Sequence, residues 1–165
     1  MNSESLTRTP NGVPPLRGEV RRGPRGLRNN NPLNIRRDGQ AWQGLCAVQT
    51  DRAFCQFKSM AYGFRAGFVT LHTYMTKHGL GTIGQIIRRW APPSENNTGA
   101  YVRTVCELTH LDKDRPLSWS DEEVMLSVVQ AMAYVENGVL VGKEGSMREG
   151  YGMARKSIML RKKAV

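Results

Sequence analysis

The 165-residue chain lacks several features that would assign it to a class directly. It has no run of about 18 apolar residues, so we expect no membrane span. Its opening segment, MNSESLTRTPNGVPP, has no apolar core of a secretory signal, so we do not expect export by that route. The three cysteines show no CxxC spacing. Cys46 and Cys55 could pair across a hairpin, but we expect free buried thiols in a protein made in the cytoplasm.

Motifs for several kinds of chemistry are also missing. The chain contains no GxSxG segment, no GxGxxG segment and no glycine-rich phosphate loop. The spacing of His72, His78 and His110 does not place them on one helix face as a ligand set. We therefore expect neither a metal site nor an organic cofactor.

The formal net charge of +10 is concentrated at the two ends of the chain. Residues 1–37 carry eight arginines against two acidic residues, and residues 148–165 carry six basic residues against one. Residues 38–147 are nearly neutral, with ten basic and eleven acidic residues. The ends are either solvated solubility arms or contacts to an anionic partner such as packaged nucleic acid, another virion protein or the cell wall.

The pattern of residues predicts a mainly α (α+β) domain at 26–165, preceded by an extended basic arm rich in Pro, Gly and Arg at 1–25. Segment 40–57 resembles a small β-hairpin with a turn at Thr50-Asp51-Arg52. Helical spacing begins at Ser59 and stops near Gly79. Further helices are expected after Thr82, from Asn97 or Thr98, from Ser120 to Gly138, and over 147–160; the helix at Ser120 opens with a Ser120–Glu123 capping box.

Glu136 stands at the end of the most apolar of these predicted helices. The negative end of the helix dipole lies there, and the neighbours Tyr134 and Val135 disfavour a charged group. Both effects favour a carboxyl group that keeps its proton and can donate it to a leaving oxygen, as glycosidic bond cleavage requires. The alternative interpretation is a surface glutamate in the last helical turn.

The Asn-rich segment at residues 28–36, RNNNPLNIR, gives this glutamate a context. Followed by Trp42-Gln-Gly44 and Phe54-x-x-Phe57-x-Ser59, it resembles a pattern in peptidoglycan glucosaminidases and lytic transglycosylases. It is also similar to a group of phage virion-associated lysozyme-like proteins. The motifs shared with that group are Arg89-Trp-Ala-Pro-Pro-x-Glu95-Asn-x-Thr98 and Val135-Glu136-Asn137-Gly138. The resemblance implies a lysozyme-like helical fold that acts on peptidoglycan.

One departure concerns the order of the motifs along the chain. In the glucosaminidases the catalytic glutamate precedes the Asn-rich segment, whereas Glu136 follows it here. We interpret this as a circular permutation, in which the glutamate helix comes last in sequence but packs beside the Asn-rich loop. Glu95, in a loop, is the alternative catalytic acid. Lytic transglycosylases use a single carboxyl group, so a lone Glu136 favours that mechanism over hydrolysis with two carboxylates.

Several residues are candidates to bind the sugar substrate. Asn29–Asn31 and Pro32 form a bend, which Leu33 and Ile35 anchor in the core, leaving Asn34 to face the cleft. Trp42 and Tyr62 are candidates to stack on sugar rings, although core packing is the commoner role of such side chains. Asn31 of the Asn-rich segment and Asn137 of the Val135–Gly138 motif are added as candidates. The predicted substrate-binding residues are therefore Asn31, Asn34, Trp42, Tyr62 and Asn137.

Three functions remain open at this point. The first is a virion-associated enzyme that degrades peptidoglycan glycan strands during cell entry. Such an enzyme would be made in the host cytoplasm, become part of the virion and be delivered by it. The second is a non-catalytic structural virion protein that contacts neighbouring subunits through its basic arm. The third is a nucleic-acid-associated protein that acts through its basic ends.

Overall fold

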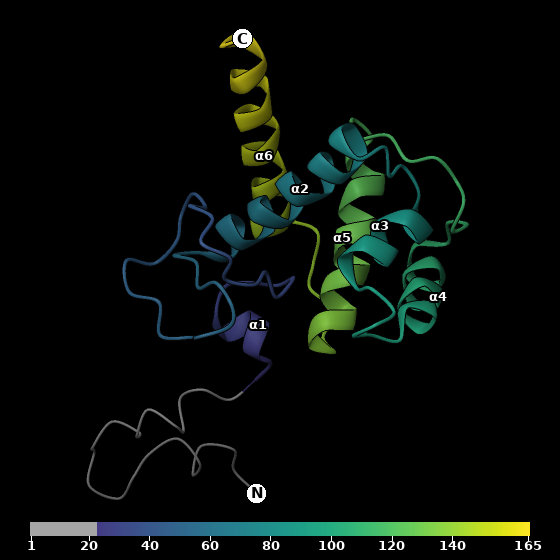
Figure 1. Ribbon diagram of the computed structural model, residues 1–165, viewed down its shortest axis with the longest axis horizontal. Helices are drawn as coiled ribbons and strands as arrows, with labels where there is room; N and C mark the ends of the chain where they lie inside the picture. The colour runs from purple at the N-terminus through teal and green to yellow at the C-terminus, as the bar shows by residue number, and fades with distance from the viewer. Residues whose placement is uncertain (1–22) are drawn as a thin grey trace, which may run out of the picture.

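The computed structural model describes residues 23–165, and within that range the chain is mainly helical, as predicted. In Figure 1, α2 and α6 cross each other, and α3, α4 and α5 gather beside them, while α6 extends beyond the rest with the C-terminus at its far end. The predicted arm lies outside the described residues except for its last three, and Arg25 already belongs to α1. The helices are α1 (Arg25–Arg28), α2 (Met60–Lys77), α3 (Ile83–Trp90), α4 (Thr98–Thr109), α5 (Glu122–Asn137) and α6 (Ser146–Lys163).

Side-chain caps set the starts of α2, α3, α4 and α5, because the first backbone N–H groups of a helix have no partner within it. Thr82 accepts from the backbone of Gln85, and Asn97 accepts from the backbone of Ala100. The predicted Ser120 cap is wrong by one residue. Asp121 is the cap and accepts from the backbone N–H of Val124, while the Ser120 hydroxyl pairs with that of Ser118.

The predicted hairpin at 40–57 is not present as a sheet. Within the described residues the segment forms only two isolated antiparallel bridges, Arg36 with Phe54 and Leu45 with Phe57. Side chains take the place of a ladder: Gln49 exchanges hydrogen bonds with the backbone N–H and carbonyl of Gln56, at 2.7 Å each. Because side chains already satisfy these backbone groups, regular strands do not form.

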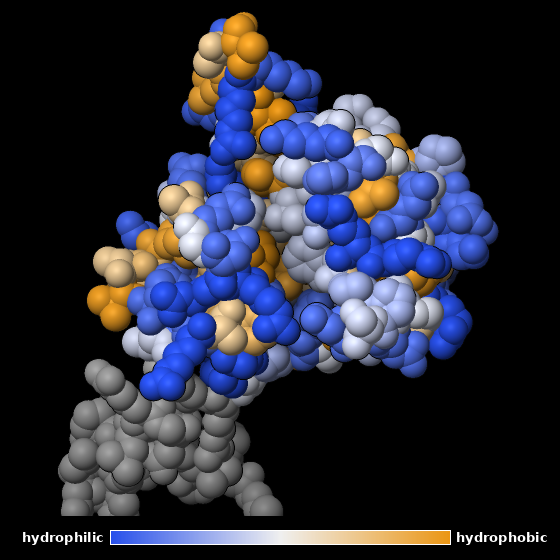
Figure 2. Space-filling view, in the orientation of Figure 1, coloured by the Kyte–Doolittle hydropathy of each residue, from blue (hydrophilic) through white to orange (hydrophobic). Residues whose placement is uncertain are grey.

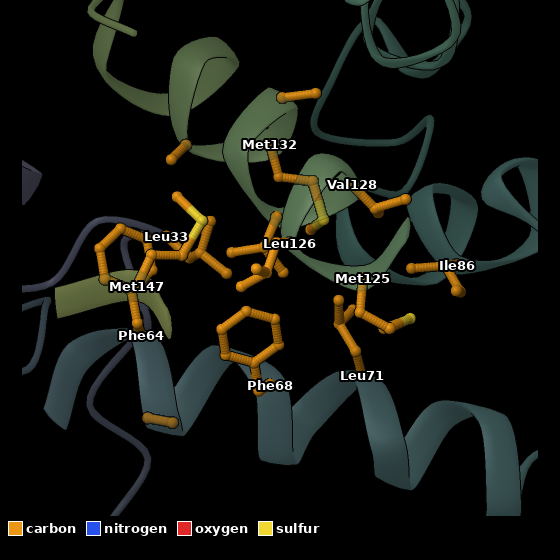
Figure 3. Close-up of a cluster of buried hydrophobic side chains, with 14 of the residues drawn as sticks. Leu33, Phe64, Phe68, Leu71, Ile86, Met125, Leu126, Val128, Met132 and Met147 are labelled. Carbon is orange, nitrogen blue, oxygen red and sulfur yellow. The ribbon is translucent and has the colours of Figure 1, made fainter. Parts of the chain in front are cut away.

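The core lies where α2, α5 and α6 meet, and the Asn-rich loop contributes to it. Figure 3 shows Leu33 and Met147 near the α5 residues Leu126 and Met132, with the rings of Phe64 and Phe68 from α2 packed against the same group. Leu33 is completely buried, and Ile35 is 9% exposed. The prediction that these two residues anchor the loop in the core is therefore confirmed.

The Asn-rich loop approaches α2 so closely that only glycine fits at the contact. A Cβ atom at Gly63 would overlap the backbone carbonyl of Asn30 and lie 2.8 Å from Cδ of Pro32. Backbone cannot move aside as a flexible side chain can, so this position fixes the distance between helix and loop.

We expect Gly63→Ala to lower the free energy of unfolding by about 1–3 kcal/mol, the usual cost of overpacking. Gly152→Ala is the matched control, because Gly152 lies in α6 and a Cβ there would have no neighbour within 4 Å. The control should gain about 0.5–1 kcal/mol from the better helix former. Urea unfolding of both variants measures the difference, and equal stability of the two would contradict the close approach.

Asp51 connects α1 to the irregular segment at residues 40–57, of which it is a part. Its carboxylate accepts two hydrogen bonds from Arg25 at 2.7 Å, one from Asn29 at 2.9 Å, and two from the backbone N–H groups of Ala53 and Phe54. The Arg25 guanidinium is the main cause that holds the pKa of Asp51 well below its usual value, with the backbone donors and Asn29 adding to it. The ionised form is thus the one that the fold stabilises.

Because the folded-state pKa of Asp51 is depressed, its contribution to stability is complete above the unfolded value of about 4 and is lost as the pH falls below that value. Asp51→Asn should cost about 1–3 kcal/mol at neutral pH, with a loss that shrinks as the pH falls below about 4. Asp114→Asn is the control, since that side chain is 74% exposed. Unfolding curves at several pH values test this, and a pH-independent loss would rule it out.

No helix among residues 23–165 has the length and apolar character needed to cross a bilayer.

Candidate functional site

Glu136 lies in the last turn of α5, half-buried, and its carboxyl group is held from three directions. Oε1 accepts from the indole N–H of Trp90 at 3.2 Å and from the hydroxyl of Tyr101 at 3.1 Å. Oε2 accepts from the side-chain amide of Asn34 at 3.1 Å. The three donors come from α3, α4 and the Asn-rich loop, so elements distant in sequence orient a single carboxyl group.

Tyr101 is a permanent donor in this arrangement. Its side chain is almost fully buried, with 7% exposure of the residue. Burial, followed by the neighbouring Glu136 carboxylate, raises the pKa of Tyr101 well above its usual value. The hydroxyl therefore stays protonated and keeps donating to Glu136 at any pH at which the protein would work.

The Asn-rich loop reaches Glu136 because Asn34 adopts a left-handed backbone conformation, with φ of 51°. Asparagine tolerates that region better than most residues. Asn137, the next residue of α5, donates to the carbonyl of Pro32 at 2.7 Å and to that of Ala133 at 2.9 Å. The structure therefore brings Asn34 beside Glu136 and Asn137, which follow it about a hundred residues later in the sequence.

Gly26 of α1 faces both asparagine side chains. A Cβ atom there would lie 2.5 Å from Oδ1 of Asn137 and 2.7 Å from Oδ1 of Asn34. Within the described part of the chain these two buried oxygens have no hydrogen-bond partner. Their close approach to a bare Cα suits weak C–H···O contacts, and any larger residue at position 26 would push Asn34 from Glu136.

Asn31 has a different environment from Asn34. It is completely buried, donates to the carbonyls of Ile35 and Cys55 at 2.9 Å each, and accepts from the N–H of Ile35 at 2.8 Å. These bonds occupy its amide with backbone partners. Asn31 therefore ties the loop to the irregular segment behind it.

A cavity of about 660 Å³, hereafter the Glu136 cavity, opens in front of the carboxyl group. It contains four aromatic side chains, including Trp42, and the basic residues outnumber the acidic ones. Asn31, Asn137 and Tyr62 are not among its lining residues; the ring of Tyr62 packs against Gly44 instead. Its polar, charged and aromatic lining includes Asn34, Arg36, Asp38, Trp42, Phe54, Tyr74, Lys77, Arg89, Trp90, Glu95, Asn96, Glu136 and Arg161.

Two further carboxyl groups, Asp38 and Glu95, line the same cavity. Both residues are exposed, and within residues 23–165 neither side chain is hydrogen-bonded to another side chain. Glu136 is therefore the carboxyl group that the fold holds in one orientation, and Glu95 lines the same cavity without such contacts. In residues 23–165 no group of three or more His, Cys, Asp or Glu side chains is arranged to hold a metal ion.

Trp90 and Tyr101 were not predicted as site residues. Trp90 lies inside the Arg89–Thr98 motif, so the sequence did mark its neighbourhood, although Glu95 was the residue predicted from that motif. The sequence pattern around Tyr101 indicated only a buried position on a helix. Their shared contact with Glu136 depends on the packing of α3 and α4 against α5, which no local pattern encodes.

Fold and site together define a mainly helical protein with an oriented carboxyl group in an open, aromatic-lined cavity, which suits proton transfer to or from a bound molecule. No protein-family model matches the chain. The chain is 41% identical over 130 residues to Protein P5 of Pseudoalteromonas phage PM2, an alignment that covers 77% of this chain and 79% of that protein. The chain belongs to the family of this bacteriophage protein.

A double-mutant cycle tests the central contact of the site. Tyr101→Phe and Glu136→Ala each remove one partner, and we expect a coupling energy of about 1–3 kcal/mol between them in urea unfolding. Tyr101→Phe combined with Glu107→Ala is the control, because Glu107 is exposed on the same helix. Additive losses in the first cycle would show that the two side chains do not interact.

Proposed function

We propose that the protein is a virion-associated enzyme that cleaves peptidoglycan glycan strands during cell entry, by a mechanism like that of lytic transglycosylases. The observation that carries the proposal is the hydrogen bond between Asn34 and Glu136, 102 residues apart, on the wall of one cavity. It is the arrangement expected if the catalytic glutamate helix and the Asn-rich loop have exchanged order in the sequence. Membership of a bacteriophage protein family agrees with delivery by a virion.

Glu136 supplies the chemistry in this proposal. Its carboxyl group donates a proton to the glycosidic oxygen as the bond from C1 breaks. The resulting carboxylate then takes the proton from the 6-hydroxyl of the same muramic acid, whose oxygen bonds to C1. The product is a 1,6-anhydro sugar, and Glu136 returns to its starting state without consuming water. Trp90, Tyr101 and Asn34 keep the carboxyl group oriented through both steps.

The cavity lining suits a sugar chain. Trp42 offers a ring on which a sugar can stack, and Asn34 offers an amide. Arginine guanidinium groups lie over the rings of Phe54 and Tyr74, so these two rings line the cavity together with positive charge. Asn31 and Asn137 contribute by fixing the loop that carries Asn34, and Tyr62 contributes through packing below Gly44. In this proposal only Trp42 and Asn34, of the five predicted binding residues, touch the substrate directly.

Glu95 and Asp38 allow a hydrolytic variant of the same proposal. A hydrolase needs a second carboxyl group to act on water or on the sugar, and both of these residues line the cavity. The two mechanisms differ in product, because hydrolysis leaves a reducing end and transglycosylation leaves a 1,6-anhydro end.

A specific observation favours a second candidate, a non-catalytic structural virion protein. The far end of α6 extends beyond the rest of the chain and exposes Met159, Leu160 and Val165 among basic residues (Figure 2). Such a surface suits contact with a neighbouring protein of the particle. The basic arm, which we predict to contact other virion proteins or nucleic acid, lies outside the described residues.

We expect the wild-type chain to reduce the turbidity of purified peptidoglycan and to release products with 1,6-anhydro ends by mass. Glu136→Gln keeps the size of the side chain but cannot donate the proton, and should lower the rate by at least 100-fold. Glu107→Gln is the matched control and should retain full activity.

Other outcomes would revise the proposal in defined ways. Activity that survives Glu136→Gln but is lost in Glu95→Gln would move the acid to Glu95, and reducing-end products would replace transglycosylation with hydrolysis. A correctly folded wild-type chain with no activity on peptidoglycan would refute the enzymatic proposal in favour of the structural one.

A further inference from the structure

A second cavity, of about 1190 Å³, lies between α3, α4 and the segment that follows α4. We refer to it as the α3–α4 cavity. It shares Arg89 and Asn96 with the Glu136 cavity, so the two adjoin each other. Figure 2 shows strongly hydrophilic residues gathered over α3 and α4 on the visible face. A long molecule bound at Glu136 would therefore reach the neighbourhood of this second cavity.

The charged residues of the α3–α4 cavity are mostly basic. Arg88, Arg89, Arg103 and Lys113 line it against a single acidic residue, Asp114. Lys113 pairs with Asp114 at 3.3 Å, in an exposed salt bridge of the kind that contributes little. Within residues 23–165 the three arginines form no salt bridge. The guanidinium group of Arg89 lies over the ring of Tyr74, whereas those of Arg88 and Arg103 are available to carboxylates.

The remaining lining combines small apolar residues with neutral polar ones, and it differs chemically from that of the Glu136 cavity. Leu80, Pro93, Val102 and two glycines form the apolar part, and no aromatic side chain is among the lining residues. The neutral polar residues are Gln85, Asn96, Asn97 and Thr98. Sugars and nucleic-acid bases bind preferentially on aromatic faces, which the Glu136 cavity has and the α3–α4 cavity lacks. The lining instead suits a short chain that carries both carboxylates and small apolar side chains.

We propose that the α3–α4 cavity binds the acidic peptide stem attached to the glycan strand, with Arg88 and Arg103 as the residues that contact its carboxylates. The inference rests on the proposed function, because the stem is part of the same polymer. Stem peptides of peptidoglycan combine carboxylates with the methyl groups of alanine, which matches the basic rim and small apolar walls. The cavity would then select strands that still carry their peptides.

Binding to fragments tests this without any cleavage. The wild-type chain is titrated with a thio-linked disaccharide that it cannot cleave, with and without an acidic tetrapeptide stem. We expect the stem to increase affinity by about tenfold, equivalent to about 1.4 kcal/mol. Arg103→Gln, alone and with Arg88→Gln, should remove that gain while leaving the affinity for the bare disaccharide unchanged.

Arg115→Gln is the matched control, because Arg115 is exposed in the segment after α4 but does not line the cavity. It removes the same charge and should keep the tenfold gain. NMR should show shifts at the amides of Gly99 and Val102 when the stem is present and none with the bare disaccharide, which provides a readout independent of the variants.

Three results would overturn the inference. These are equal affinity for the two fragments, equal loss of the gain in Arg115→Gln, and displacement of the stem by an oligonucleotide of equal charge at equal concentration. The last would identify a non-specific basic surface. Turnover is measured separately, so stem binding without cleavage would refute the proposed enzyme and retain this cavity assignment, whereas cleavage without stem discrimination would do the reverse.

Discussion

Burial of the Asn-rich loop between α2 and α5 is the constraint on which the site depends. Leu33 anchors the loop in the core, Asn31 satisfies its backbone, and Gly63 permits the close approach of α2. Polar backbone buried without partners would cost several kilocalories per mole, and the asparagine side chains remove that cost. The loop is thereby rigid enough to hold Asn34 against Glu136, although it contains no regular secondary structure beyond the end of α1.

The site is built almost entirely from contacts distant in sequence. Glu136 meets Asn34, Trp90 and Tyr101 across separations of 102, 46 and 35 residues. Each donor belongs to an element that is positioned by the core rather than by its neighbours in the chain. A substitution that alters the packing of α3 or α4 would therefore displace Trp90 or Tyr101 from the carboxyl group, even where the altered residue lies far from the cavity.

Much of the helical framework could be predicted from sequence because it follows from local signals. Thr82, Asn97 and Gly138 mark helix ends that the structure confirms. The hairpin could not be predicted correctly, because Gln49 and Asp51 satisfy backbone groups that a ladder would otherwise use. Ser120 and Asp121 are both good caps, and local pattern alone does not choose between adjacent ones.

In the candidate site, too, local sequence patterns predicted some residues and missed those that depend on packing. Glu136 was found because its signal is local, a carboxyl group at the end of an apolar helix followed by Asn-Gly. Tyr101 was missed because an apolar helix position gives no sign that its hydroxyl faces a carboxylate. The α3–α4 cavity had no motif at all, since its arginines come from two helices that must first pack. α3 links both spaces, with Trp90 bonded to Glu136 and Arg88 facing the second cavity. The proposed binding of one polymer to both cavities therefore depends on the position of α3.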